Sequence, residues 1–422
     1  MPSFDGKEDV SVFDHQIEVI VLFSIFLWFL VWGGMFTGDY NIKSSLMFSN
    51  SFAFFQGFRA LLPILAVYIV FVWAMTQRPG FPFKKNPVRF FFMFWLIGFT
   101  VSIFISPVAV KSLYWAMMYL SPFFVMWAAL EADDPIVSLR WIMYINYGIF
   151  ILLTLSLVPD VMKGGNISAA HDRMYTLPFN LGEIISNGVG RYALVSIIVA
   201  GTRFQFQQGK KKLLWLPLIV LSLYVLARTQ SRTALLGFAV ASILFFLMRK
   251  MDWRLIFAGP IASYVIWISG YKWRARGSLD RLVDLSGRED AWQRAIELIK
   301  QSPLLGWGFH ADRILLQSEH MHNSFLHSMI QTGLIGMLFF VAAFLATWVL
   351  VFKTRIIGRI KDIQGEDKLL IMESVMILGF MTSRGFFEST AAYYGVDLLL
   401  LIPVMAFICL WTMNNPQSSH RS

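Results

Sequence analysis

The run NSFLHSMIQTGLIGMLFFVAAFLATWVLVF, residues 323–352, contains no Asp, Glu, Lys or Arg. A helix needs roughly 20 mostly apolar residues to cross the hydrocarbon core of a bilayer, which is about 30 Å thick. This run is long enough to do so as a single helix. It therefore predicts that the chain is embedded in a membrane.

Outward from this run, similar apolar stretches recur along nearly the whole chain. Of the 422 residues, 57% are hydrophobic and 15% are charged, which is well above the apolar share of a soluble domain. The stretches predict about twelve membrane helices and an all-α, polytopic bundle that forms one transmembrane domain over residues 1–422. The expected helices are 17–36, 60–76, 89–105, 112–130, 136–158, 184–202, 213–228, 233–248, 254–269, 323–352, 368–382 and 393–413.

Four short basic loops fix the expected orientation. They all fall on one side of the twelve-helix count, and basic loops collect in the cytoplasm, so both termini are expected inside. The same rule explains the net charge of +10 without nucleic acid, which is not an expected partner. No signal peptide is expected, because the N-terminal segment lacks a basic region followed by a cleavage site. The four loops are 77–89, 203–212, 249–254 and 353–361.

The largest outer loop, 270–322, lies between the ninth and tenth expected helices and has enough polar residues for a small extramembrane subdomain. Within it, Ser286 can cap a helix whose first turn carries Glu289 and Asp290. Apolar residues then follow at helical spacing, and this stripe is expected on the membrane surface or on the bundle. The stripe consists of Trp292, Ala295, Ile296 and Ile299.

Several arginines lie at the outer ends of the expected helices, against the positive-inside bias. They are Arg191, Arg228, Arg232, Arg288 and Arg384. Each alone could extend to the lipid headgroups or pair with a nearby carboxylate. As a group they indicate recognition of a phosphorylated anion, because arginine binds phosphate oxygens in a bidentate way.

Three histidines lie where the large loop re-enters the membrane: His320, His322 and His327. Their spacing does not place three nitrogens on one helical face, and the single Cys409 cannot build a zinc site, so no metal is expected. A single working histidine, His322, could exchange a proton or donate hydrogen bonds to a diphosphate or sugar. A structural role remains the alternative for His322, and more so for the other two. Gly333 and Gly336 can mark a close helix contact.

Three strings in this order resemble the bacterial O-antigen ligase and polysaccharide polymerase superfamily. They are SRTALLGF (231–238), SGREDAWQRAIELIKQSPLLGWGF (286–309) and HNSFLHSMIQTGLIG (322–336). The resemblance implies a membrane glycosyltransferase that acts at the periplasmic face on glycans linked to undecaprenyl diphosphate, without a metal or another cofactor. The acceptor hydroxyl would attack the anomeric carbon of the donor, and the lipid diphosphate would leave.

The resemblance also assigns residues. The histidine of the family corresponds to His322 and its functional arginines to Arg232 and Arg288, so these three are the expected catalytic residues, with Arg191 as a further arginine at the substrate. Arg228 is a further candidate for substrate binding. Arg384 and Glu388 could add a sugar or diphosphate contact, or could form a structural salt bridge.

Two subclasses share these strings, and only the acceptor separates them. A polymerase would extend the lipid-linked glycan, whereas a ligase would transfer it to lipid A core. The ending GFFESTAAYYGVDLLLLIP (385–403) favours an exopolysaccharide polymerase. Membrane lipids and proteins that set chain length or export polymer are further expected partners. A transporter of an anionic lipid or solute is the rival from another class, because intramembrane arginines would also serve it.

Overall fold

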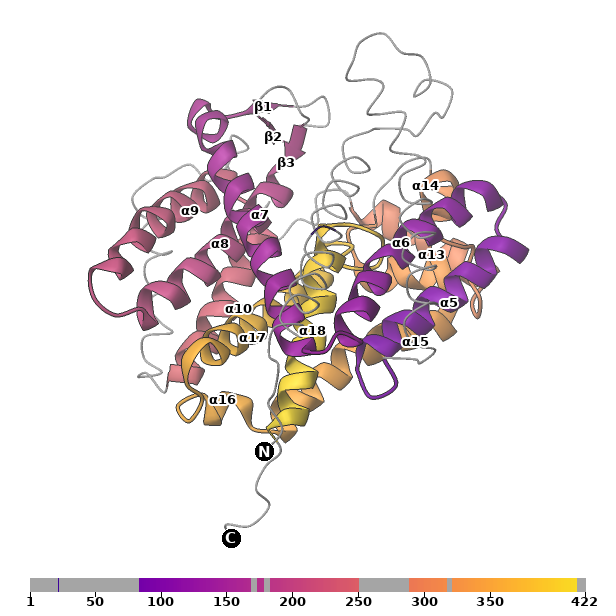
Figure 1. Cartoon of the computed structure of the whole chain (residues 1–422). Coiled ribbons are helices and arrows are strands. Elements are labelled where there is room, and N and C mark those ends of the chain that lie inside the picture. The colour runs from indigo at the N-terminus through magenta and orange to yellow at the C-terminus, as the bar shows by residue number, and fades with distance from the viewer. Residues whose placement is uncertain are drawn as a thin grey trace, which may run out of the picture.

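The computed structural model describes residues 83–167, 173–177, 183–249, 288–316 and 321–415, together with Leu22. In these ranges long helices lie side by side in a bundle (Figure 1). The helices are α5 (Val88–Phe104), α6 (Ala109–Leu130), α7 (Pro135–Lys163), α8 (Ser186–Phe206), η2 (Lys210–Leu214), α9 (Trp215–Thr229), α10 (Arg232–Arg249), α13 (Arg288–Gln301), α14 (Ala311–Leu315), α15 (Ser324–Lys353), α16 (Ile356–Arg359), α17 (Gly365–Gly385) and α18 (Val396–Asn414).

The expected runs are helical wherever the structure describes them. Helices α5 to α10, α15, α17 and α18 coincide with nine of the twelve expected runs. The runs 60–76 and 254–269 lie outside the described residues, and of 17–36 only Leu22 is described. Six segments are long and apolar enough to span a bilayer: α6, α7, η2 with α9, α10, α15 and α18. The chain is therefore a helical membrane bundle.

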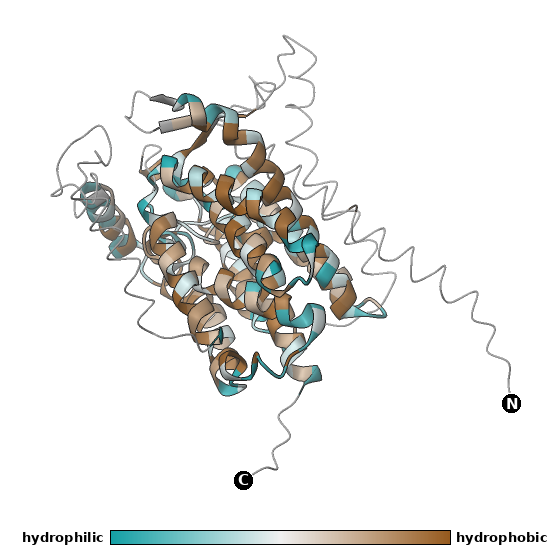
Figure 2. Cartoon of the chain, turned by 90° about the vertical axis from the view of Figure 1, so that its left-hand side faces the viewer, coloured by the Kyte–Doolittle hydropathy of each residue, from teal (hydrophilic) through white to brown (hydrophobic). Residues whose placement is uncertain are grey.

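The surface of the bundle is apolar. Figure 2 shows hydrophobic residues along most of the helices, and Leu152, Leu338 and Leu345 are each more than half exposed. Such side chains suit a lipid environment rather than water. Helix α18 is the opposite case, because nearly all of its side chains are buried among α5, α6, α7, α15 and α17. It is the central helix around which the polar groups described below gather.

The helical bundle also contains one small antiparallel sheet in its described residues, between α7 and α8. Its strands are β1 (Asn166–Ile167), β2 (Arg173–Thr176) and β3 (Glu183–Ile185). Gly164 ends α7 with a φ of 98°, in the left-handed region that glycine adopts without strain. The backbone N–H of Thr176 donates to Asp160 at 2.7 Å, which ties the sheet to the last turns of α7. Helix α8 starts directly after β3, so the sheet fixes where that helix begins.

Helix α15 is broken at Gly333, whose φ of 63° and ψ of −169° are not helical. The loop after α13 enters the break and replaces the missing hydrogen bonds: the N–H of Trp307 donates to Ile330 O at 2.8 Å, and the N–H of Leu334 donates to Pro303 O at 2.8 Å. A Cβ at position 333 would overlap the backbone of Leu304. The expected close contact at this glycine is therefore with a loop, and not with another helix.

The predicted helix of the large loop is confirmed as α13, and its apolar stripe packs on the bundle. Ala295 and Ile299 are buried in a cluster with Ile330 of α15. Trp292 is partly buried, and its indole N–H donates to Met321 O at 2.6 Å. Ile296 departs from the expectation, because 43% of it is exposed. The predicted cap, Ser286, lies outside the described residues.

Replacing Trp292 with Phe should weaken the attachment of α13 to the residue just before His322. An aromatic ring is kept, although a smaller one, and the carbonyl of Met321 loses its donor, which costs about 1 kcal/mol. We expect a thermal midpoint lowered by a few degrees in detergent. Trp141→Phe is the control, because Trp141 is 46% exposed on α7. Equal midpoints for the two variants would contradict this role of the indole.

Candidate active site

Polar side chains gather where α8, α10, α15 and α18 begin and where α17 ends; this is called the site end of the bundle. Their first turns carry Asn187, Thr233, Ser324 and Asp397, in that order. The N-terminus of each helix bears a partial positive charge from its aligned peptide dipoles. Four such ends around one cluster favour the binding of an anion there.

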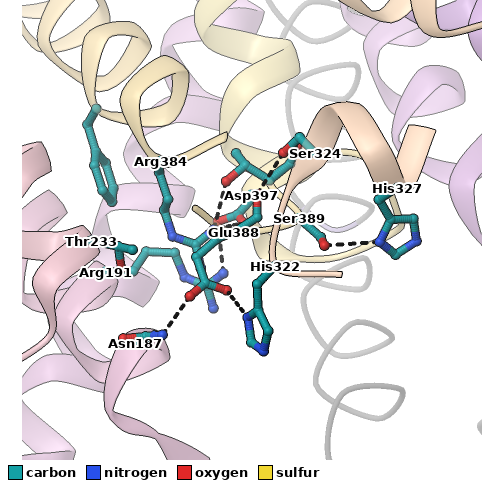
Figure 3. A network of polar contacts seen from close by, with 12 residues as sticks. Asn187, Arg191, Thr233, His322, Ser324, His327, Arg384, Glu388, Ser389 and Asp397 are labelled. Atoms are coloured by element: carbon teal, nitrogen blue, oxygen red, sulfur yellow. Dashed lines mark hydrogen bonds and ion pairs between the residues drawn. The ribbon is translucent and has the colours of Figure 1, made fainter. Parts of the chain in front are cut away.

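Glu388 lies at the centre of one half of the cluster (Figure 3). One carboxylate oxygen lies 3.0 Å from Nδ1 of His322, and the other accepts a hydrogen bond of 2.6 Å from the amide of Asn187. The hydroxyl of Ser231 donates to Asn187 at 2.8 Å. The His322 side chain is 26% exposed, whereas that of Glu388 is 8% exposed. The buried carboxylate thus holds a histidine that can still be reached from outside.

Asp397 lies at the centre of the other half, between two arginines. Arg191 binds one of its oxygens at 2.8 Å, and Arg384 binds the other through a very short contact. Arg384 also donates to the hydroxyl of Thr390 at 2.9 Å. All three charged side chains are at most 7% exposed. Two buried cations thus share one buried anion, and an unpaired charge at this depth would be strongly unfavourable.

The loop between α17 and α18 is tied to the start of α15. The hydroxyl of Ser324 donates to the carbonyls of Glu388 and Thr390 at 2.8 and 2.9 Å. The side chain of Asn323 caps α15 by accepting from two backbone N–H groups, and its amide donates to Phe386 O at 3.1 Å. These bonds give His322, the residue before Asn323, a fixed position relative to Glu388.

The structure brings four of the seven sequence-predicted site residues into these two groups: His322, Glu388, Arg191 and Arg384. Arg384 and Glu388 do not pair with each other, which corrects the salt-bridge alternative. Their partners are Asp397 and His322.

The other three predicted site residues, all arginines, lie at the end of α9 and at the starts of α10 and α13. Arg232 is the first residue of α10, is partly buried, and lies between two network residues, Ser231 and Thr233. Arg288 begins α13, and its side chain is outside the description. Arg228 lies at the end of α9 beside the small sheet, where the Tyr175 hydroxyl donates to its carbonyl at 3.4 Å. Arg228 thus borders the sheet.

Sequence reasoning missed Asp397, Asn187 and Ser231. Asp397 had a signal, because it is the one acid in the apolar run 393–413, and an acid in such a run needs a charged partner. Asn187 and Ser231 are short polar residues next to helix starts, where they are common as caps. Nothing in their local sequence distinguishes them as members of a site.

The two described histidines near the end of the large loop, His322 and His327, have different partners. His322 contacts Glu388, whereas His327 contacts Ser389 and Asp312; His320 lies outside the described residues. In the part of the chain that the structure describes, no three His, Cys, Asp or Glu side chains lie close enough together to hold a metal ion.

Two comparisons place this geometry among known proteins. A family model described as O-antigen ligase matches residues 217–341, which include Arg232, Arg288 and His322. The exopolysaccharide production protein ExoQ of Rhizobium meliloti (strain 1021) is 28% identical over 257 residues, and the match covers 54% of this chain and 55% of that protein. The chain thus matches about half the length of this relative. The comparisons confirm the resemblance to the O-antigen ligase and polysaccharide polymerase superfamily.

Proposed function

We propose that the chain is a membrane glycosyltransferase that polymerises polysaccharide repeat units carried on undecaprenyl diphosphate. It lies in the bacterial inner membrane with about twelve helices and both termini in the cytoplasm, and its site end faces the periplasm. The observation that carries the proposal is the His322–Glu388 pair beside two buried arginines that share one carboxylate. The site thus contains a proton acceptor, His322, next to positive charge that can bind an anionic leaving group.

His322 deprotonates the acceptor hydroxyl in this proposal. When its Nδ1–H donates to Glu388, Nε2 on the other edge of the ring carries the lone pair that accepts the proton of the hydroxyl. The Glu388 carboxylate orients the ring and stabilises the imidazolium that forms, as a carboxylate does beside the histidine of a catalytic triad. The hydroxyl oxygen then attacks the anomeric carbon, and the bond from that carbon to the lipid diphosphate breaks.

The arginines stabilise the diphosphate as it leaves. Arg191 and Arg384 together carry one more positive charge than Asp397 balances, and the helix N-termini at the site end add to this field. Arg232, Arg288 and Arg228 supply further guanidiniums from α10, α13 and α9. Preorganised charges of this kind stabilise the transition state more than the ground state, because they act where negative charge develops.

The opposite end of the bundle favours an enzyme over a transporter. There, Arg203 of α8 binds Glu366 of α17 at 2.6 Å and the fully buried Glu373 at 3.2 Å. Arg140 of α7 binds Asp367 of α17 at 2.6 Å. A transporter must open to both sides of the membrane, and opening here would separate these pairs. The ion pairs therefore support a reaction that takes place at one face only.

The acceptor distinguishes the two enzyme candidates. The printed name of the relative concerns exopolysaccharide production, which supports a polymerase. The description of the matching family, O-antigen ligase, supports transfer to lipid A core as the second candidate. In both cases the reducing-end sugar leaves the lipid carrier, so the same site chemistry serves either acceptor.

The proposal is tested with purified protein in nanodiscs. An undecaprenyl diphosphate-linked repeat unit is supplied alone, and then together with lipid A core. A ladder of longer lipid-linked glycans from the donor alone is the expected result. If product forms only in the presence of lipid A core, the chain is a ligase and not a polymerase. If neither product forms and the donor is instead transported between leaflets, the proposal that the chain is an enzyme is wrong.

Turnover should not depend on a divalent cation. The arginines supply positive charge at the leaving group, which is what a bound cation does in metal-dependent glycosyl transfer. We expect the same rate with excess EDTA and with added Mg²⁺ or Mn²⁺. A rate that falls with EDTA and returns with either cation would contradict the metal-free mechanism.

A further inference from the structure

A second histidine lies beside the proposed active site and takes no part in the mechanism above. His327, on the first turn of α15, is 1% exposed. Its Nδ1 lies 3.0 Å from the hydroxyl of Ser389, and its Nε2 lies 3.3 Å from a carboxylate oxygen of Asp312 on α14. Ser389 is the neighbour of Glu388 in the chain, so His322, just before α15, and His327, on its first turn, contact two consecutive residues of one loop (Figure 3).

The ring of His327 is held on all sides. The side-chain amide of Gln331 lies 2.5 Å from Nε2, and the ring of Tyr393 stacks on the imidazole with 5.5 Å between centroids. Asp312 is fully buried. Its carboxylate accepts no hydrogen bond from the described residues, and its 3.3 Å contact with Nε2 is an ion pair only when the imidazole is protonated, so the ring is fixed chiefly by Ser389, Gln331 and Tyr393. A ring fixed in this way can hold Ser389 at a constant position.

The position of Ser389 determines that of Glu388. One peptide unit joins the two residues, and rotation about the backbone at Ser389 would move the Glu388 carboxylate relative to His322. The Ser324 hydroxyl holds the carbonyl of Glu388 at 2.8 Å, but it does not touch the carboxylate. The hydroxyl of Ser389 is thus a second anchor on the loop, next to the residue that orients the proposed base.

We propose that His327, held by Gln331 and Tyr393, is a positioning residue that acts through Ser389 to keep Glu388 against His322. This inference rests on the proposed function for its catalytic consequence, but the positioning itself does not require that function. It assigns no contact with substrate to His327 or Ser389. Substitutions at His327 or Ser389 should therefore lower turnover only while the Glu388 carboxylate is present to orient His322.

The test is a double-mutant cycle in turnover. Ser389→Ala removes one hydroxyl and leaves the Asp312–His327 pair intact; we expect turnover to fall about tenfold, the equivalent of one hydrogen bond. In a Glu388→Gln background the same change should cause no further loss. Ser328→Ala is the matched control, because this buried hydroxyl on α15 donates only to Phe325 O of its own helix, at 2.9 Å. Its turnover should equal that of the wild type.

A second measurement, the chemical modification of His322, does not depend on transferase activity. The rate at which diethyl pyrocarbonate modifies His322 is followed by mass spectrometry in the wild type, Ser389→Ala and Ser328→Ala. Release of Glu388 should raise the rate several-fold in Ser389→Ala alone. Additive losses in the cycle, or equal modification rates in both serine variants, would overturn the inference. A wild type without product but with the expected change in modification would refute the proposed function and keep the positioning role.

Discussion

Replacing His322 with Ala should lower turnover by about 10²–10⁴, the usual contribution of a positioned base. The change removes the imidazole that lies 3.0 Å from Glu388, and it leaves the Arg191–Asp397–Arg384 group untouched. Because the arginines still bind the diphosphate, we expect KM for the donor to change little. The measurement is steady-state glycan formation in nanodiscs, with kcat and KM determined separately.

His310→Ala is the matched control for this substitution. Both histidines have a left-handed backbone, with φ of 45° at His322 and 61° at His310, so alanine introduces similar backbone strain at both positions. The ring of His310 packs against Trp115 of α6 in a tilted arrangement, with 3.9 Å between the ring centroids. Comparable activity of the two alanine variants would assign the loss to the backbone and not to the imidazole.

His322→Asn separates orientation from proton transfer. Asparagine tolerates the left-handed region and keeps a side-chain donor for Glu388, but its amide is not a base. We expect it to be as inactive as His322→Ala. Substantial activity in this variant would mean that His322 orients the acceptor by hydrogen bonding and does not take its proton.

The parts of the fold that depend on local sequence could be predicted. Membrane helices need only length and apolar composition, and the runs 89–105 and 323–352 became α5 and α15 within a residue or two. The apolar stripe of α13 is equally local, and Ala295 and Ile299 are buried as its spacing indicates. Arginines at outer helix ends run against the usual charge bias, which is why Arg191 and Arg384 could be identified before any contact was known.

The partners of these residues could not be predicted, because they depend on which helices are neighbours. Arg191 and Asp397 are 206 positions apart in the chain, and Arg384 pairs with Asp397 although Glu388 is closer in sequence. The break in α15 was hidden for a similar reason. Gly333 is compatible with an ordinary helix until the loop at Leu304 enters it.

Asp397→Asn should destabilise the protein by about 3–5 kcal/mol, the cost of removing one member of a buried ion pair. The substitution preserves shape, but it leaves Arg191 and Arg384 buried without the carboxylate that both contact. The two guanidiniums would repel each other. Arg384, at the end of α17, would also lose its ion pair with the start of α18. We expect a markedly lower thermal midpoint and turnover reduced at all donor concentrations.

Asp367→Asn provides the comparison, because it makes the same change at the opposite end of the bundle. Asp367 is also in the first turn of its helix and binds Arg140 at 2.6 Å, but both side chains are about 30% exposed. A pair that water can reach contributes about 0–1 kcal/mol, so the thermal midpoint and turnover should stay close to those of the wild type. If the two Asn variants unfold at the same temperature, then Asp397 is not the buried counter-ion of the arginines. If Asp397→Asn is less stable but fully active, the arginines do not need it to bind the leaving diphosphate.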